Sequence, residues 1–334
     1  MRIVLDAMGG DNAPAAIVEG AVLASKVLEN TIVLVGDEGK ILSELKKYSF
    51  ESSRIEVKHA SEVIENEDSP VKAIRSKKDS SMVVGINMLK DGSGDVFISA
   101  GNTGALMAGG IFNLGRIQGI DRPAIATAYP ILGGRPVLLI DSGANSECKP
   151  ENLLEFAMMG SLYMEHVFGR ENPSVGLINI GAEEKKGNTL TKAAYLLLKE
   201  SGLNFYGNVE GRDVPFGVSD IYVCDGFTGN IILKLSEGLG LSILKTLKRK
   251  LTAGMRAKLG AMLLLDKIKE IKSEFDYSEY GGAPILGVKG AIVKMHGSSD
   301  ANAVKNTIIK AVPFAEHDVV SLIQDSVMLL QDEE

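Results

Sequence analysis

The sequence predicts a three-layer α/β/α fold in which a mainly parallel sheet lies between two layers of helices. Nine short apolar runs recur along the 334 residues, and helical patterns lie between several of them. Continuous apolar strands that alternate with helices are typical of a parallel sheet covered on both faces. No linker rich in proline or serine and no internal repeat divides the chain. We therefore expect a single domain over residues 1–334, with a helical hairpin excursion at about 236–276.

The nine apolar runs are the expected strands, and helices are expected between them. A first helix is predicted at Ala15–Leu28 and another at Leu190–Leu198, where Asn188 and Thr189 are suitable caps. The expected strands are Arg2–Asp6, Thr31–Val35, Arg54–Lys58, Asp95–Ser99, Pro136–Asp141, Ser174–Ile180, Asn204–Asn208, Ser219–Cys224 and Ala291–Met295.

The composition narrows the class of protein. Hydrophobic residues make up 45% of the chain and charged residues 24%, as in globular proteins. The net charge of −7 argues against general binding of nucleic acids. Two cysteines cannot form a disulfide framework and suggest a reducing compartment. Because neither an export signal nor an apolar run of roughly 18 residues is present, we expect a cytoplasmic protein.

Six of the apolar runs end in glycine and small polar residues. These ends are DAMGGDNAP, ISAGNTGALM, LIDSGANSECKP, INIGAEEKKGN, VCDGFTGNI and KMHGSSDANA. In open α/β sheets the ligand binds beyond the carboxyl ends of the strands. We therefore expect these six loops to lie along one edge of the sheet and to form a wide, polar site lined with glycine.

A bare phosphate suits these loops better than a nucleotide does. The chain has no GxGxxG after its first strand and no GxxxxGK[ST] motif. The amides of Asn102–Gly104 are expected to open a helix, where free N–H groups and the helix dipole favour an anion, and Thr228–Asn230 repeat the arrangement. The alternative, that Asn102 and Thr228 only cap helices, stays open. Lys185 and Lys186 either add positive charge to this edge or belong to a solvated loop.

His296 is the histidine best placed for chemistry. It follows a strand and precedes Gly297–Asp300, so we expect it among the polar loops. The four histidines lack the spacing of a zinc motif, and no GxSxG nucleophile motif is present. Cys148 could serve as a nucleophile, but a packing role is favoured.

Eight motifs together resemble the bacterial phosphate acyltransferases of phospholipid synthesis. In order, they are DAMGGDNAP, SAGNTGALM, GIDRPA, DSGAN, KKGN, DGFTGN with a later LK, YGGAPILG and HGSSDANA, and they extend to about residue 305. The resemblance implies transfer of a fatty acyl group from acyl carrier protein to inorganic phosphate, giving acyl phosphate. It also implies a fold similar to isocitrate and isopropylmalate dehydrogenases and to phosphotransacetylase, a homodimer, and peripheral membrane association. We expect no cofactor and no metal.

One residue departs from the family pattern. The family commonly has histidine after DAMGGD, where this chain has Asn12. An amide donates a hydrogen bond but cannot carry a proton. Either a hydrogen bond is all that this position supplies, or another group is the base.

The expected mechanism is direct transfer without an acyl-enzyme. Preorganised amides would stabilise the developing oxyanion, Lys185 would balance charge and His296 would act as an acid or base. Asp6, Asp141 and Asp225 are expected to orient loops, because like charges keep them from phosphate. The expected substrate-binding residues are Gly9, Gly10, Asp11, Asn12, Gly101, Asn102, Thr103, Gly104, Asn145, Asn188, Thr228, Gly229, Asn230 and Ser298.

Residues 245–272 differ from the rest of the chain, with nine basic residues against two acidic ones. Their apolar positions keep helical spacing, which predicts a helical hairpin with Met262, Leu263, Leu264 and Leu265 near its tip. Such an element can lie on an anionic membrane, dock an acidic carrier protein or cover a dimer interface. We favour the membrane, because four consecutive large apolar residues exceed what carrier docking needs.

Two other functions are considered. A metal-dependent hydroxyacid dehydrogenase on the same fold would need clustered aspartates and several arginines, and the loops offer few arginines. A non-catalytic adaptor that binds a membrane or a carrier protein through the basic hairpin would leave the six polar loops without a purpose.

Overall fold

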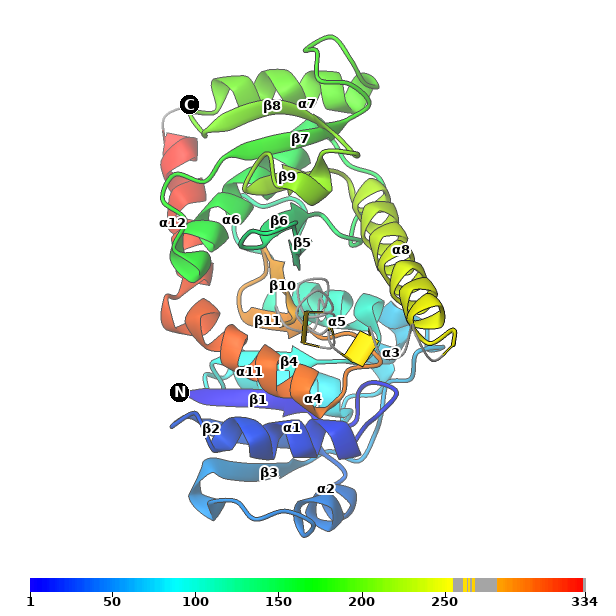
Figure 1. Cartoon of the computed structure of the whole chain (residues 1–334). Helices are drawn as coiled ribbons and strands as arrows, with labels where there is room; N and C mark the ends of the chain where they lie inside the picture. Colours follow the sequence, from blue (N-terminus) through cyan, green and yellow to red (C-terminus); the bar gives the residue numbers. More distant parts are fainter. Residues whose placement is uncertain (255–260, 263, 265, 268–280, 333–334) are drawn as a thin grey trace.

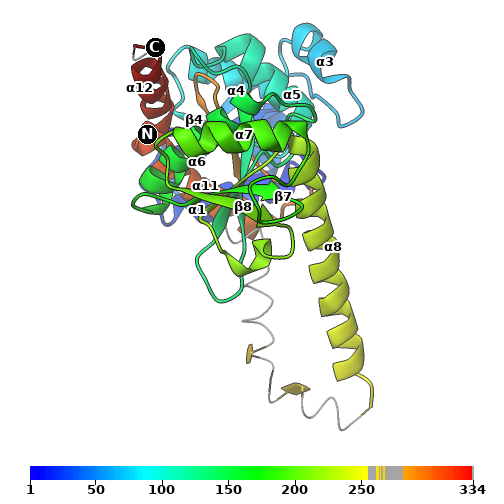
Figure 2. The ribbon, with the colours of Figure 1, turned by 90° about the horizontal axis from the view of Figure 1, so that it is seen from above.

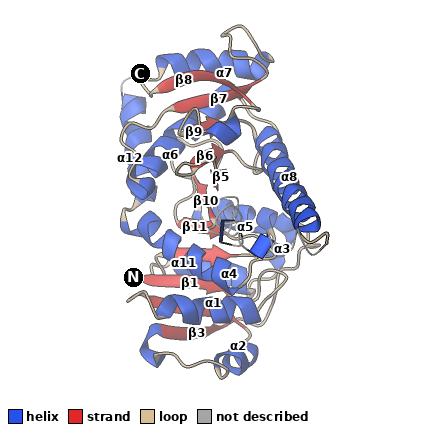
Figure 3. Cartoon of the chain, viewed as in Figure 1, coloured by secondary structure: helices blue, strands red, loops and turns tan. Residues whose placement is uncertain are grey.

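The computed structural model describes residues 1–254, 261, 262, 264, 266, 267 and 281–332. Eleven strands form one sheet with helices on both faces, which confirms the predicted three-layer α/β class (Figures 1 and 3). The strands are β1 (Arg2–Asp6), β2 (Thr31–Gly36), β3 (Ile55–His59), β4 (Val96–Ser99), β5 (Ala124–Tyr129), β6 (Val137–Ile140), β7 (Val175–Asn179), β8 (Phe205–Glu210), β9 (Ile221–Val223), β10 (Ala283–Leu286) and β11 (Ala291–Lys294).

The helices alternate with the strands over most of the chain. They are α1 (Ala15–Ser25), α2 (Glu38–Leu45), α3 (Pro70–Ser76), α4 (Ser81–Lys90), α5 (Thr103–Gly109), α6 (Pro150–Phe168), α7 (Thr189–Glu200), α8 (Gly226–Leu251), α11 (Ala301–Glu316) and α12 (Val319–Asp332). Short helical turns lie at Ser52–Arg54, Gly110–Leu114 and Val214–Phe216. The two predicted helices correspond to α1, which ends three residues earlier than Leu28, and to α7, which Asn188 caps through a 2.9 Å bond to the Thr191 amide.

The hydrophobic core lies on both faces of the sheet. Ile3 and Leu5 of β1 pack with α1, α6 and α11 on one face, whereas Val4 packs with α3, α4 and α5 on the other. Successive side chains of a strand point to opposite faces, so a sheet covered on both sides requires strands that are apolar throughout. The first of these layers continues from β1 as far as β7 and joins the two ends of the sheet into one body.

The sheet consists of two groups of parallel strands that run in opposite directions. The strand order is β3-β2-β1-β4-β11-β10-β5-β6-β9-β7-β8. We call β1–β4 with β11 the first half and β6–β9 the second half. Between them, β10 pairs antiparallel with β11 and β5, and β5 pairs antiparallel with β6. Lys294 at the end of β11 is paired with Ala283 at the start of β10, whereas Ile140 at the end of β6 is paired with Ala126 of β5.

The expectation that six loops share one edge of the sheet is therefore wrong. The antiparallel strands β5 and β10, which were not predicted, reverse the strand direction between the two halves, so the six loops do not follow one row of parallel strands. The right-handed twist of neighbouring strands accumulates across eleven strands and reorients one half relative to the other. As a result, β1 and β7 both run toward the side of the molecule that carries α8 (Figure 1).

Helix α8 connects the two halves. It begins where β9 ends, and the Ser236 hydroxyl lies 2.7 Å from the hydroxyl of Tyr129 at the end of β5. The helix therefore crosses from one edge of the sheet to the other, and its second part extends beyond the body of the molecule (Figure 2). Only Gly226 and Gly229 of its 26 residues are buried. The returning arm of the expected hairpin, with Leu263 and Leu265, lies outside the described residues.

Within the described part of the chain, no helix has both the length and the apolar character to cross a bilayer.

Candidate functional site

Three loops of the first half meet beyond the ends of β1, β4 and β11. We call the β1–α1, β4–α5 and β11–α11 loops the first loop cluster. The buried Asp6 carboxylate accepts a 2.7 Å hydrogen bond from the Ser99 hydroxyl, which in turn accepts a 3.0 Å bond from the Gly101 amide. The Asp11 amide donates to the Gly297 carbonyl at 2.8 Å. These bonds fix the three loops relative to one another.

The two consecutive glycines allow the loops to approach this closely. A Cβ atom on Gly9 would lie 2.6 Å from the Asp6 carboxylate and 2.8 Å from the Gly101 nitrogen. Gly10 has φ +97°, a conformation that side chains other than glycine rarely adopt. The DAMGGD segment is thus a close-packed turn with exposed polar residues, Asp11 and Asn12, at its far end.

Asn12 bridges two of these loops. Its side-chain amide donates to the carbonyls of Ser298 and Ser299, both at 3.1 Å. His296 is exposed next to them, and its Nδ1 lies 2.9 Å from the Ser298 hydroxyl. The structure therefore brings together Asn12, His296 and Ser298, which the sequence placed among the candidate site residues.

Asn102 is the cap of α5. Its Oδ1 accepts from the Ala105 amide at 3.0 Å, and its Nδ2 donates to the Asn66 carbonyl at 3.0 Å. Thr103 and Gly104 are exposed at the start of the helix. The side chain of Asn102 is thus engaged within the protein, and the exposed groups here belong to the two residues that follow it.

A second loop cluster, formed by the β6–α6 and β9–α8 loops, lies beyond the ends of β6 and β9 in the second half. The Asp141 carboxylate is fully buried. It accepts from the amides of Ile125, Gly143, Ala144 and Asn145 and from the Asn145 side chain, at 2.7 to 3.1 Å. Burial raises the pKa of Asp141, and the N–H donors oppose that shift.

The start of α8 is fastened to this second cluster. The Asn145 carbonyl accepts from the Gly226 amide at 2.7 Å, and a Cβ atom on Gly229 would lie 1.9 Å from the Asp141 carbonyl oxygen. Asp225, rather than Thr228, is the cap of α8. Its carboxylate accepts from the Thr228 amide and hydroxyl, both at 2.9 Å, so these donors are already used. Asn230 is exposed one turn into the helix.

Lys185 lies in the β7–α7 loop, which the structure places apart from the first loop cluster. This loop is at the β8 end of the molecule, whereas the β1–α1 loop is toward the β3 end (Figure 1). Lys185 and Lys186 are exposed. Lys185 and His296, the two expected catalytic residues, are thus not brought together.

Lys294 was missed by the sequence analysis. It ends β11, is only partly exposed, and its Nζ donates to the neighbouring Met295 carbonyl. Burial lowers the pKa of Lys294 to about 8; Lys234 of α8 lowers it as well, while Asp6 and Asp11 raise it. A lysine directly after three apolar residues of a strand, in AIVKMHG, is the signal that could have identified it.

The thiols are poorly suited to nucleophilic attack. Burial raises the pKa of Cys148 to about 12, and it raises the pKa of the buried Cys224 well above its ordinary value. Because the thiolate is the reactive form, neither thiol is activated. Over the described ranges, no three side chains of His, Cys, Asp or Glu are grouped closely enough to hold a metal ion.

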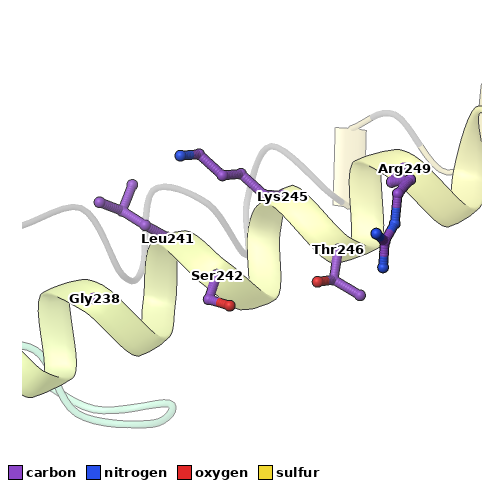
Figure 4. A pocket seen from close by; sticks show the side chains of 6 residues that line it. All are labelled: Gly238, Leu241, Ser242, Lys245, Thr246 and Arg249. Carbon is purple, nitrogen blue, oxygen red and sulfur yellow. The ribbon is translucent and has the colours of Figure 1, made fainter.

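A cavity of about 460 Å³ lies along the second part of α8. Its lining residues are Gly238, Leu241, Ser242, Lys245, Thr246 and Arg249 (Figure 4). All six come from one face of the helix.

Comparison with known proteins identifies relatives over the full chain. A family model described as fatty acid synthesis protein matches residues 1–322. The phosphate acyltransferase of Alkaliphilus oremlandii is 54% identical over 334 residues, which cover 100% of this chain and 99% of the relative. The phosphate acyltransferase of Clostridioides difficile is 50% identical over 333 residues, which cover 100% of this chain and 98% of that relative.

Solved structures share the fold at low sequence identity. A phosphotransacetylase from Streptococcus pyogenes has a TM-score of 0.61 at 14% identity and covers 95% of this chain and 94% of its own. A 4-hydroxythreonine-4-phosphate dehydrogenase from Klebsiella pneumoniae has a TM-score of 0.52 at 13% identity. The match covers 94% of this chain and 99% of the dehydrogenase chain. The fold is thus common to acyl-transferring and dehydrogenating enzymes.

Proposed function

The chain belongs to the phosphate acyltransferase family, and from this premise we propose that its acyl donor is an acyl carrier protein. The enzyme transfers a fatty acyl group to phosphate for phospholipid synthesis. With a carrier thioester as donor, the C–S bond breaks, a C–O bond to phosphate forms, and the products are acyl phosphate and the free carrier thiol. The dehydrogenase alternative shares only the fold.

The acyl group passes directly to phosphate in this proposal. A phosphate oxygen attacks the thioester carbonyl, and the tetrahedral intermediate expels the thiolate. A thiol of pKa about 8.5 leaves with little help from an acid. The raised pKa of Cys148 and the burial of Cys224 support a route without an acyl-cysteine. The main requirement is therefore to hold phosphate and to stabilise the oxyanion.

The first loop cluster supplies the groups for this step. The exposed starts of α5 and of the Asp11–Asn12 turn offer polar groups near His296, which serves as the acid or base. Ser298, next to the Nδ1 atom of His296, orients the imidazole.

The fixed meeting of three glycine-rich loops around His296 is the observation that carries the proposal. The test is release of the carrier thiol from acyl carrier protein, measured with and without phosphate. Release only with phosphate is expected. Thiol release at the same rate without phosphate would reveal a hydrolase and contradict the proposal, and a radiolabelled acyl group retained on the denatured protein would contradict direct transfer.

We further propose that the enzyme is a homodimer that contacts its partner through α8. A helix that projects from the body while exposing large apolar side chains leaves considerable apolar surface in water. The exposed apolar residues of α8 are Phe227, Ile231, Leu235, Leu239, Leu241 and Ile243. All of them except Leu241 recur every four residues along one side of the helix, and a second copy of the same helix would cover that side by a self-complementary contact.

The tip beyond α8 is the proposed contact with an anionic membrane, which makes the enzyme a cytoplasmic protein bound peripherally. Met262 and Leu264 are exposed, and Lys248, Arg249 and Lys250 lie in the last turn of α8, which precedes them in the sequence. Each basic residue near an anionic surface adds about 1 kcal/mol to binding. Flotation with anionic vesicles, but not with neutral ones, is expected; an unchanged flotation of a Leu263→Asp/Leu264→Asp/Leu265→Asp variant would reject the tip as the anchor.

A further inference from the structure

Lys294 occupies an unusual place for a lysine. The three preceding residues of β11 are buried and apolar, and Lys294 is paired on either side with Ser99 of β4 and Ala283 of β10. Its ammonium group donates to the Met295 carbonyl. In the described part of the chain, no carboxylate lies within 4.0 Å of it to form an ion pair. An ammonium group thus lies where β11 ends and the β11–α11 loop begins, without a counterion in contact.

The charged groups that face Lys294 come from three different elements. Asp6 of β1 and Asp11 of the β1–α1 loop interact with it from the first half, and Lys234 of α8 interacts with it from the other side. Asp6 is already bonded to the Ser99 hydroxyl. Lys234 is paired with Glu237 at 2.8 Å and is otherwise exposed. The geometry of the sheet agrees with this, because β10 pairs with Lys294 through Ala283 and runs beside β5, and the end of β5 at Tyr129 lies 2.7 Å from Ser236 of α8. Helix α8 therefore brings the ammonium group of Lys234 to the end of the sheet where β11 ends and the loop that holds His296 begins.

Two ammonium groups that approach each other repel, and an anion between them removes that cost. On this basis we propose that inorganic phosphate binds between Lys294 and Lys234, with Lys294 as the residue that contacts and selects the doubly charged anion. The inference rests on the proposed function and adds the residues that bind the phosphate substrate. It also gives α8 a role in the site, since the helix brings a cation of the second half to the first loop cluster.

A small tetrahedral anion suits this place better than the acyl chain or the carrier. The first loop cluster at this end of the sheet is polar and exposed at the Asp11–Asn12 turn, at His296 and Ser298, and at the start of α5. The apolar residues of β11 are all buried beneath Lys294 and offer no surface to an acyl chain. Phosphate bound to an ammonium at this depth gains a charge-assisted hydrogen bond, which is stronger than a neutral one.

The pH dependence follows from the charge of Lys294. Its pKa of about 8 means that the ammonium is present below pH 8 and is lost as the pH rises above that value. Phosphate itself is already largely the dianion there, since its second pKa is about 6 to 7 by analogy with phosphate esters. The kcat/KM for phosphate should therefore fall above pH 8, by about tenfold per unit when only the protonated lysine binds. An arginine stays charged throughout this range.

The test compares Lys294→Met, Lys294→Arg and Lys234→Met in the full-length enzyme, with steady-state KM for phosphate and calorimetric binding of inorganic phosphate alone. Lys294→Met should raise the KM for phosphate and the dissociation constant of phosphate by roughly ten- to a hundredfold, as expected for the loss of one charged hydrogen bond. Lys234→Met should have a smaller effect of the same kind. Lys294→Arg should keep phosphate binding and remove the alkaline fall in kcat/KM.

Lys289→Met is the matched control, because this exposed lysine precedes β11 at its opposite end and should change neither quantity. An unchanged phosphate KM in Lys294→Met would overturn the inference. A lower kcat with an unchanged KM would do the same, because it would assign Lys294 to the oxyanion. If Lys294→Met fails to fold, the Lys294→Arg variant still tests the inference. A fall in its kcat/KM for phosphate above pH 8 that is identical to the fall in the wild type would overturn the inference. Absence of phosphate-dependent thiol release by the wild type would instead refute the proposed function.

Discussion

Gly9 lies where two loops leave no space for a side chain. Replacement by alanine places a methyl group against the Asp6 carboxylate and the Gly101 backbone. Overpacking of this kind costs about 1–3 kcal/mol. We therefore expect Gly9→Ala to lower the free energy of unfolding by that amount in urea titrations and to weaken phosphate binding, because the loops must separate.

Gly211→Ala is the control for this change, since Gly211 has no atom within 4 Å of the added methyl group and its φ is not in the left-handed range. It should alter stability by less than about 0.5 kcal/mol. A Gly9→Ala variant as stable as this control would contradict the prediction, because it would show that the loops move apart at little cost in free energy.

Single residues of the site differ in how far the sequence reveals them. The glycines, Asn12 and His296 stand in strand-end motifs whose chemistry is local, so the sequence can indicate them. Lys294 stands in the same motif, but its importance depends on burial and on Lys234, which lies 60 residues earlier. Only the crossing of α8 brings the two together, and no local pattern predicts that crossing.

Individual strands also differ in whether the sequence alone can predict them. Val137–Ile140 could be predicted because the run VLLI is apolar on both faces. β10 could not, because Pro284 lacks the amide hydrogen of a ladder and such a residue argues against a central strand. Pairing with β5 begins only at Ile285, which is how the proline is accommodated. Missing these antiparallel strands led to the incorrect single edge for the loops.

Helix α8 carries the prediction of a homodimer. Aspartate at Leu239 and Ile243, both more than half exposed, would place two charges in the proposed contact between helices. We expect the Leu239→Asp/Ile243→Asp variant to sediment as a monomer at concentrations where the wild type is a dimer, because buried unpaired charges are costly.

The control for this variant is Lys248→Asp. Lys248 follows Leu239 by nine residues, which places it on the opposite side of the helix. It should leave the wild-type dimer intact although it also makes α8 more negative. Equal dissociation of both variants would mean that the net charge of the helix, rather than its apolar face, controls association.

The whole molecule should unfold as one unit despite its two halves. One sheet passes through β10 and β5, and one hydrophobic layer extends from β1 to β7, so neither half can lose its core without exposing that of the other. Calorimetry should show a single transition whose calorimetric and van't Hoff enthalpies agree. Phosphate at a hundred times its dissociation constant should stabilise the protein by about 2.7 kcal/mol and raise the temperature of that same transition. Two transitions, of which phosphate shifts only one, would show that the halves are separate domains and that the anion is held by one of them alone.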